Sequence, residues 1–202
     1  MRRFDCLEQL ARMISDQALV ICNLQDTTYE WQHIRPSDGN LLRQGMALVT
    51  PVAFGLAKAL PHRQVIALDG DGSILLGPGI MTTLGRYAPK NLFVLVFDNE
   101  TYNSGGVIPS ATAYGTSLEA MARGAGIKHA ATVRSLQEFQ DAVQAALNST
   151  EMSFVVAKVD RQPVEVPRPR IDGKESKYRF VRFVEALEGR QILLADEQKS
   201  FS

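Results

Sequence analysis

The sequence is poor in the residues that build disulfide frameworks, metal clusters and membrane spans. Its 202 residues include two cysteines, three histidines and one tryptophan. Two thiols exclude an iron–sulfur cluster, which takes four cysteine ligands, and Cys6 and Cys22 lack the spacing of a zinc site. No apolar run is long enough to span a bilayer, and residues 1–5 lead into an amphipathic helix rather than a signal peptide. We therefore expect a cytoplasmic protein with two buried, reduced thiols.

The sequence also lacks an excess of charge of either sign. Lysine plus arginine and aspartate plus glutamate both number 22, so the formal charge is zero, and the basic residues are scattered along the chain. This balance excludes the basic footprint expected of a protein that binds nucleic acid or an anionic membrane. With 45% hydrophobic residues, the length suits one globular domain with a well-buried core.

Three common phosphate- and metal-binding loops are missing as well. No Gly-Lys-Ser/Thr of a Walker loop occurs, and Leu75 stands where a dinucleotide fingerprint needs its third glycine. Residues 69–73, Asp-Gly-Asp-Gly-Ser, begin like a calcium loop, but Ile74 and Ile80 replace the glycine and the glutamate that such a loop requires. The Asp-Gly pairs also suit a hairpin turn, yet the apolar run before them does not alternate as hairpin strands do.

The middle of the chain instead has the pattern of a strand–loop–helix–strand unit. Apolar runs at 64–68 and 92–97 each end in a polar cluster, and a helix is predicted between them over 78–87. A crossover of this kind makes the two strands parallel and brings their carboxyl ends to one edge of the sheet. We therefore expect Asp71 and Asn99 to lie close together. A carboxylate and an amide oxygen beside a phosphate site suit Mg²⁺.

The remaining pattern predicts a three-layer α/β/α domain with a mainly parallel central sheet of five to six strands. We expect helices over 4–14, 42–60, 116–123 and 135–147, the last two opened by capping boxes, strands over 18–22 and 154–159, and an irregular connection over 25–40. Residues 1–160 are expected to form the domain. Residues 161–202 are expected to form a proline-containing arm and a helix over 175–187, which covers either the domain's own core or another subunit. His33 is interpreted as a solvated or core-edge histidine.

The two polar clusters resemble the signature of thiamine diphosphate (ThDP)-dependent enzymes, in which Gly-Asp-Gly is followed further along the chain by Asn. Here Gly70-Asp71-Gly72-Ser73 is followed by Asp98-Asn99, and Asn99 comes 28 residues after Asp71. The resemblance implies that Asp71, Asn99 and the backbone carbonyl of Thr101 hold Mg²⁺ against the cofactor diphosphate. The cofactor contacts that it implies are Met46, Gly70, Asp71, Gly72, Ser73, Asn99, Thr101 and Tyr102.

A second part of the family pattern, Met-x-x-x-x-Pro-x-x-x-Gly, is present upstream as Met46, Pro51 and Gly55. The resemblance implies that Met46 props the cofactor in its bent conformation. Related enzymes have Gly-Ser-Met-Gly at this point, whereas residues 44–47 of this chain are Gln-Gly-Met-Ala. The backbone beside the cofactor ring is therefore expected to differ from that of the relatives.

Further matches narrow the resemblance to the sulfopyruvate and phosphonopyruvate decarboxylases. They are Arg35-Pro36 with Asn40, Gly105-Gly106, and the run 115–123. The paired glycines either belong to a loop that closes over the site or are ordinary turn residues. Val107 stands where relatives tend to have glutamine, which leaves open which 2-oxo acid is decarboxylated.

In this family a glutamate of a separate pyrimidine-binding domain activates the cofactor. The resemblance covers only about residues 15–160, so we expect no catalytic residue in this chain and a partner subunit that supplies the glutamate. The implied function is the ThDP- and Mg²⁺-binding subunit of a 2-oxo acid decarboxylase, a carboxy-lyase. We expect it to form a hetero-oligomer, to self-associate and to act on a small 2-oxo acid. The alternatives are the small subunit of another ThDP enzyme, such as an acetolactate synthase-like one, and a non-enzymatic flavodoxin-like phosphate-binding module.

Overall fold

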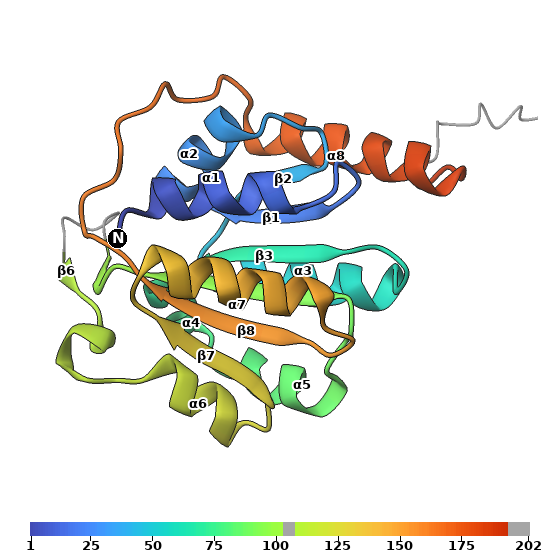
Figure 1. Ribbon diagram of the computed structural model, residues 1–202. Coiled ribbons are helices and arrows are strands. Elements are labelled where there is room, and N and C mark those ends of the chain that lie inside the picture. The colour runs from blue at the N-terminus through green and yellow to red at the C-terminus, as the bar shows by residue number, and fades with distance from the viewer. Residues whose placement is uncertain (103–107, 194–202) are drawn as a thin grey trace, which may run out of the picture.

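The computed structural model describes residues 1–102 and 108–193, and its centre is a six-stranded sheet in the order β2-β1-β3-β4-β8-β7 (Figure 1). Every neighbouring pair in this sheet is parallel. The strands are β1 (Leu19–Asn23), β2 (Asn40–Gln44), β3 (Val65–Gly70), β4 (Leu92–Asp98), β7 (His129–Val133) and β8 (Ser153–Lys158). Helices cover both faces, so the predicted three-layer α/β/α fold with a mainly parallel sheet is confirmed.

The two helical layers divide the core into two clusters, one on each face of the sheet. The layer at the front of Figure 1 contains α1 (Arg3–Met13), α2 (Asp26–Ile34) and α7 (Leu136–Asn148). The opposite layer contains α3 (Val49–Ala59), α4 (Asp71–Leu76), α5 (Ile80–Tyr87), α6 (Leu118–Gly124) and α8 (Gly173–Glu188). Because both faces are covered, the inner strands contain continuous apolar runs rather than an alternating pattern, as is typical of parallel sheets.

The strands β3 and β4 have the geometry that the middle of the sequence predicts. Their register runs from Val65 opposite Leu92 to Gly70 opposite Phe97. All seven residues of β4 are buried. Because the strands are parallel and in step, the polar residues that follow them emerge at the same edge of the sheet.

Both cysteines are free and buried, as predicted. Burial in apolar surroundings raises the pKa of the Cys6 thiol to about 12 and raises that of Cys22 further. Neither thiol is therefore ionised near neutral pH, and both act as small hydrophobic core residues.

Two sequence predictions near the start of the chain are wrong. The connection predicted over 25–40 contains the helix α2, and the helix predicted over 42–60 is the strand β2, a turn and the helix α3. The buried face of α2 is mainly polar, and the indole of its Trp31 donates a hydrogen bond to the Asn40 Oδ1 at 2.9 Å. The apolar periodicity that identifies most helices is therefore absent from α2.

The strand β7 and one helix cap also differ from expectation. The sequence did not predict β7, because His129–Val133 neither alternates regularly in burial nor forms a continuous apolar run, and it contains two alanines, which are uncommon in strands. The box predicted at Thr116–Glu119 does not form, because the N-cap is Ser117, whose side chain accepts from the Ala120 amide. The capping box between Ser135 and Glu138 is confirmed.

Beyond β8, an irregular arm over 161–172 passes across α2 and leads to α8 (Figure 1). Phe180 and Val184 of α8 are buried in the same cluster as α3 and β1, and the Ser176 hydroxyl accepts from the Leu42 amide of β2 at 2.9 Å. The helix therefore covers the domain's own core. The division of the chain at residue 160 remains a prediction. No described helix combines the length and hydrophobicity needed to cross a bilayer.

Candidate functional site

The site lies at the carboxyl edge of the sheet, where the strand order changes direction. The chain passes from β1 to β2 on one side and from β3 to β4 on the other, so the loops after β1 and β3 diverge and leave a crevice between them. A pocket occupies this crevice. Its lining residues are Arg3, Asn23, Leu24, Gln25, Asp26, Thr27, Met46, Gly70, Asp71, Gly72, Ser73, Phe97, Asn99, Thr101 and Tyr102.

Asp71 and Asn99 line this pocket together, as the two motifs predict. Asp71 opens α4, directly after the extended Gly70, and its side chain is buried. Asn99 follows β4, and its Oδ1 accepts from the Thr101 amide at 3.2 Å. That turn depends on Glu100, whose φ is 63°, a conformation that is strained for a residue with a side chain.

Burial raises the pKa of the Asp71 carboxyl to about 6. The hydrogen bond from Ser110 opposes this rise, and the nearby Asp98 carboxylate adds to it. The environment of Asp71 therefore disfavours an isolated negative charge. A cation in the pocket would supply the missing compensation.

The ring of Tyr102 lies directly against Gly72, where there is no room for a side chain. A Cβ on Gly72 would overlap the Tyr102 Cε1 atom. A Cβ on Gly70 would lie 3.3 Å from the Asn23 Nδ2, which is tighter than an ordinary contact. The two glycines keep the backbone open where β3 leads into α4.

Met46 lines the pocket on a turn that Ser73 stabilises. The backbone amide of Ala47 donates to the Ser73 Oγ at 3.0 Å. Ala47 has a φ of 64°, the left-handed conformation that glycine adopts without strain. An alanine at this position therefore adopts the turn at a cost in strain.

The loop after β1 was missed by sequence reasoning. Asn23 through Thr27 line the pocket, and the amino terminus of α2 opens onto it. Gln25, which precedes α2, has φ 59° and ψ −127°, so it is strained as Glu100 and Ala47 are. The signal that could have identified the loop is the Asp26-Thr27 pair after a buried strand, which is typical of a helix start.

An arginine–glutamate pair from two helices borders the pocket and was also missed. Arg3 donates to both carboxylate oxygens of Glu30, at 2.8 and 3.1 Å, and Glu30 is 1% exposed. The same carboxylate accepts from the Val164 amide of the arm at 3.0 Å. The pair therefore ties α1, α2 and the arm together beside the pocket.

The donor set fits a hard divalent cation. The described residues contain no group of three or more histidine, cysteine, aspartate or glutamate side chains that could hold a metal by themselves. One carboxylate, one amide oxygen and one backbone carbonyl suit Mg²⁺, which keeps part of its shell for water and phosphate oxygens. The paired glycines at 105 and 106 and the residue Val107 lie outside the described residues.

Comparison with known proteins identifies the family. The sequence profile described as "Thiamine pyrophosphate enzyme, C-terminal TPP binding domain" matches residues 29–157. Sulfopyruvate decarboxylase subunit beta of Methanocaldococcus jannaschii is 29% identical over 184 residues, which cover 91% of this chain and 97% of that protein. Phosphonopyruvate decarboxylase of Streptomyces viridochromogenes is 31% identical over 185 residues, which cover 90% of this chain and 46% of that protein.

A solved structure shows the same fold. An X-ray structure from Mycobacterium smegmatis, of a protein described as a thiamin diphosphate-dependent enzyme, superposes with a TM-score of 0.68 at 22% identity. The superposition covers 80% of this chain and 32% of that one. Because the family profile matches well over half of the sequence, the chain belongs to the family of C-terminal TPP-binding domains of thiamine pyrophosphate enzymes.

Proposed function

We propose that the chain binds ThDP and Mg²⁺ in this pocket as one subunit of a 2-oxo acid decarboxylase. The observation that carries the proposal is that Asp71, Asn99 and Thr101, which follow two different strands, line one pocket. The Asp71 carboxylate, the Asn99 amide oxygen and the Thr101 backbone carbonyl would hold the metal. When bound, ThDP supplies an electron sink for the loss of carbon dioxide from a 2-oxo acid.

The other pocket residues would hold the cofactor and exclude water from it. Gly70 and Gly72 leave the backbone accessible, and the Tyr102 ring lies against Gly72. Met46 is positioned to support the cofactor ring. Ser73 acts on the cofactor through the turn that carries Met46, since its hydroxyl bonds to the Ala47 amide.

We assign the catalytic glutamate to a pyrimidine-binding partner subunit. The described lining of the pocket includes neither a glutamate nor a histidine, so its side chains offer no general base of the expected kind. One relative of almost the same length is named a subunit beta, and another has about twice the length of this chain. Both arrangements are consistent with a site that a second domain completes. We further propose that the assembly is cytoplasmic and contains more than one copy of this chain.

The names of the relatives support a substrate with a second acidic group. They are called sulfopyruvate and phosphonopyruvate decarboxylases. We propose a 3-sulfo- or 3-phosphono-2-oxo acid as the substrate and carbon dioxide as one product. A carboxy-lyase of this type needs no oxidant.

Calorimetric titration of the chain, co-purified with its partner subunit, tests the proposal. ThDP is expected to bind in the presence of Mg²⁺, and binding is expected to be lost in Asp71→Ala, while the exposed Asp141→Ala serves as the matched control. Carbon dioxide release is then measured with sulfopyruvate, phosphonopyruvate and pyruvate. Equal ThDP binding by Asp71→Ala and the wild type would refute the assignment of the metal site. Binding without release from either acidic substrate would refute the substrate class.

A further inference from the structure

Two buried hydroxyl groups contact Asp71 from a segment that sequence reasoning did not connect with it. Ser110 and Thr112 are 1% and 5% exposed, and they flank the start of η2 (Ala111–Tyr114). The Ser110 Oγ donates to the Asp71 Oδ2 at 2.5 Å, and the Thr112 Oγ1 lies 3.3 Å from the same oxygen. The two hydroxyls are 2.8 Å apart. The Ser110 hydrogen bond orients the Asp71 carboxylate, and Thr112 packs against the Ser110 hydroxyl and the same carboxylate oxygen.

The same two residues also contact the segment that carries Asn99 and Thr101. Thr112 donates to the Asp98 Oδ1 at 2.7 Å, and the Lys158 ammonium holds the other oxygen of Asp98 at 2.9 Å. The backbone amide of Ser110 donates to the Glu100 carbonyl at 3.0 Å. Next to this bond, β5 (Thr101–Tyr102) pairs with β6 (Ile108–Pro109) in a short antiparallel ladder. Ser110 and Thr112 therefore join the two segments that carry the proposed metal ligands.

We infer that Ser110 and Thr112 are positioning residues that set the Asp71 carboxylate relative to Asn99 and the Thr101 carbonyl. Neither residue is among those that line the pocket, so they act through Asp71 and not on the cofactor directly. The inference rests on the proposed function, because it takes Asp71, Asn99 and Thr101 as the metal ligands.

The chemistry of Mg²⁺ makes the consequence measurable. Mg²⁺ demands a nearly ideal octahedral shell, whereas Ca²⁺ accepts irregular geometry and bidentate carboxylates. Removing a hydrogen bond that orients a metal ligand commonly weakens metal affinity by about 10- to 100-fold. Loss of the Ser110 hydroxyl lets the Asp71 carboxylate rotate, and loss of the Thr112 hydroxyl removes the group that holds Ser110 beside Asp98. Either loss is therefore expected to weaken Mg²⁺ binding more than Ca²⁺ binding.

Titration of the metal into the co-purified complex at saturating ThDP tests the inference. Thr112→Val and Ser110→Ala are expected to raise the Mg²⁺ dissociation constant by about 10- to 100-fold and to lower the ratio of Mg²⁺ to Ca²⁺ affinity. Thr112→Ser keeps the hydroxyl and is expected to restore most of the affinity. The Mg²⁺ dissociation constant and the ratio of Mg²⁺ to Ca²⁺ affinity are both measured without catalytic turnover.

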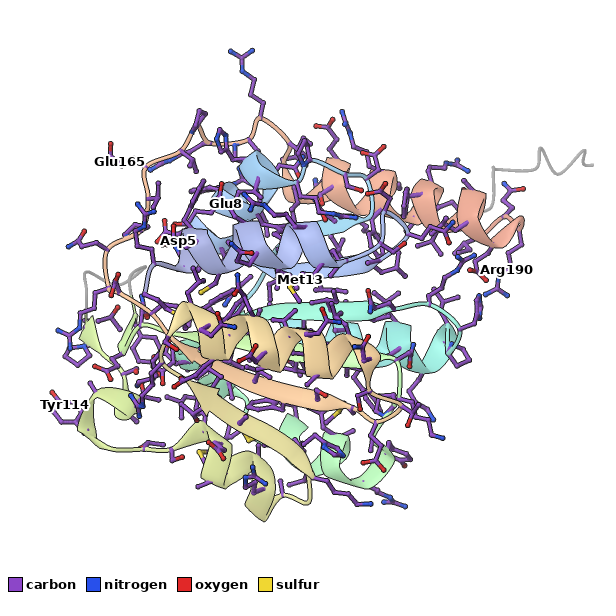
Figure 2. All side chains as sticks on the ribbon, viewed as in Figure 1. Asp5, Glu8, Met13, Tyr114, Glu165 and Arg190 are labelled. Atoms are coloured by element: carbon purple, nitrogen blue, oxygen red, sulfur yellow. The ribbon has the colours of Figure 1, made fainter. Side chains whose placement is uncertain are left out.

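Two controls separate positioning from general stability. Thr50→Val removes a buried hydroxyl that donates to another buried carboxylate, Asp69, at 2.7 Å, and it is expected to destabilise the fold without changing the metal ratio. Tyr114→Ala alters an 82% exposed side chain that points outward from η2 (Figure 2) and should change neither readout.

Three results would overturn the inference. The first is wild-type Mg²⁺ affinity in both Thr112→Val and Ser110→Ala. The second is an equal loss of affinity in Thr112→Ser and Thr112→Val. The third is a wild-type protein that binds no ThDP in the presence of Mg²⁺. This result would overturn the proposed function as well, whereas the first two results would overturn the inference alone.

Discussion

Replacing Asp71 by asparagine is expected to stabilise the metal-free protein at neutral pH while removing its Mg²⁺ site. The carboxyl has a pKa near 3.8 in the unfolded chain, and burial raises it to about 6 in the folded state. Between these pH values the folded protein holds a proton that the unfolded chain has released. The stabilisation from this proton is complete below pH 3.8 and is lost as the pH rises through 6.

The size of the shift sets the magnitude of the effect. The shift of the pKa from 3.8 to about 6 corresponds to about 3 kcal/mol of unfolding free energy. The wild type is expected to lose this stability between pH 4 and pH 7, and the mutant is not. Asparagine is expected to be tolerated, because its amide oxygen can accept the Ser110 hydrogen bond that Asp71 accepts. The mutant should therefore resemble the wild type near pH 4 and exceed it by about 3 kcal/mol at pH 7.

Urea denaturation of both proteins without metal, at intervals from pH 4 to pH 7, measures this difference. Titrating groups that do not interact with Asp71 contribute equally to the two proteins, so their effects cancel. Asp141→Asn, an exposed replacement of the same kind, is expected to follow the wild type at every pH. A difference between Asp71→Asn and the wild type that stays constant within about 0.5 kcal/mol over this range would refute the reasoning, since it would mean that Asp71 titrates normally.

Three further replacements test other parts of the site. Gly72→Ala is expected to lower ThDP affinity at least tenfold in calorimetric titration, because its methyl group would displace the Tyr102 ring. Unchanged affinity would mean that the ring does not need to lie against residue 72. Ala47→Gly is expected to raise the unfolding free energy by about 0.5–1 kcal/mol in urea, because it relieves the strain of a left-handed backbone. A loss of stability would mean that the contacts of the alanine methyl group are worth more than the strain. Glu30→Ala is expected to cost about 3–5 kcal/mol by the same assay, because it leaves Arg3 without its buried partner; a cost below about 1 kcal/mol would exclude this role.

Each of these replacements has a control in the chain. Gly79→Ala adds a methyl group where nothing lies within 4 Å, so it should leave ThDP affinity unchanged. Ala88 also has a positive φ, 33°, but it follows α5 at the opposite edge of the sheet, so Ala88→Gly should affect stability without affecting the cofactor. Glu165 is exposed on the arm (Figure 2), and Glu165→Ala should change stability by less than about 0.5 kcal/mol.

The sequence by itself determined the centre of the fold and the core of the candidate site. The apolar runs of β3 and β4 and the helical segment between them required a parallel crossover, and that crossover required Asp71 and Asn99 to emerge at one edge. These conclusions depend on hydrophobic pattern and chain direction, which are local properties of the sequence. The helix α5 and the capping box of α7 were predictable for the same reason.

Only the tertiary structure decided which side chains surround that core site. Ser110 contacts Asp71 across 39 residues, and Arg3 contacts Glu30 across 27. Trp31 of α2 is buried against Asn40, so tertiary contacts hold a helix that has little apolar periodicity. Hydrogen bonds between distant segments leave no pattern in one sequence, because each partner is an ordinary polar residue until the fold brings it to the other. The sequence specified the ligand-bearing edge of the sheet, and the packing of η2, α1 and α2 determined how its side chains are held.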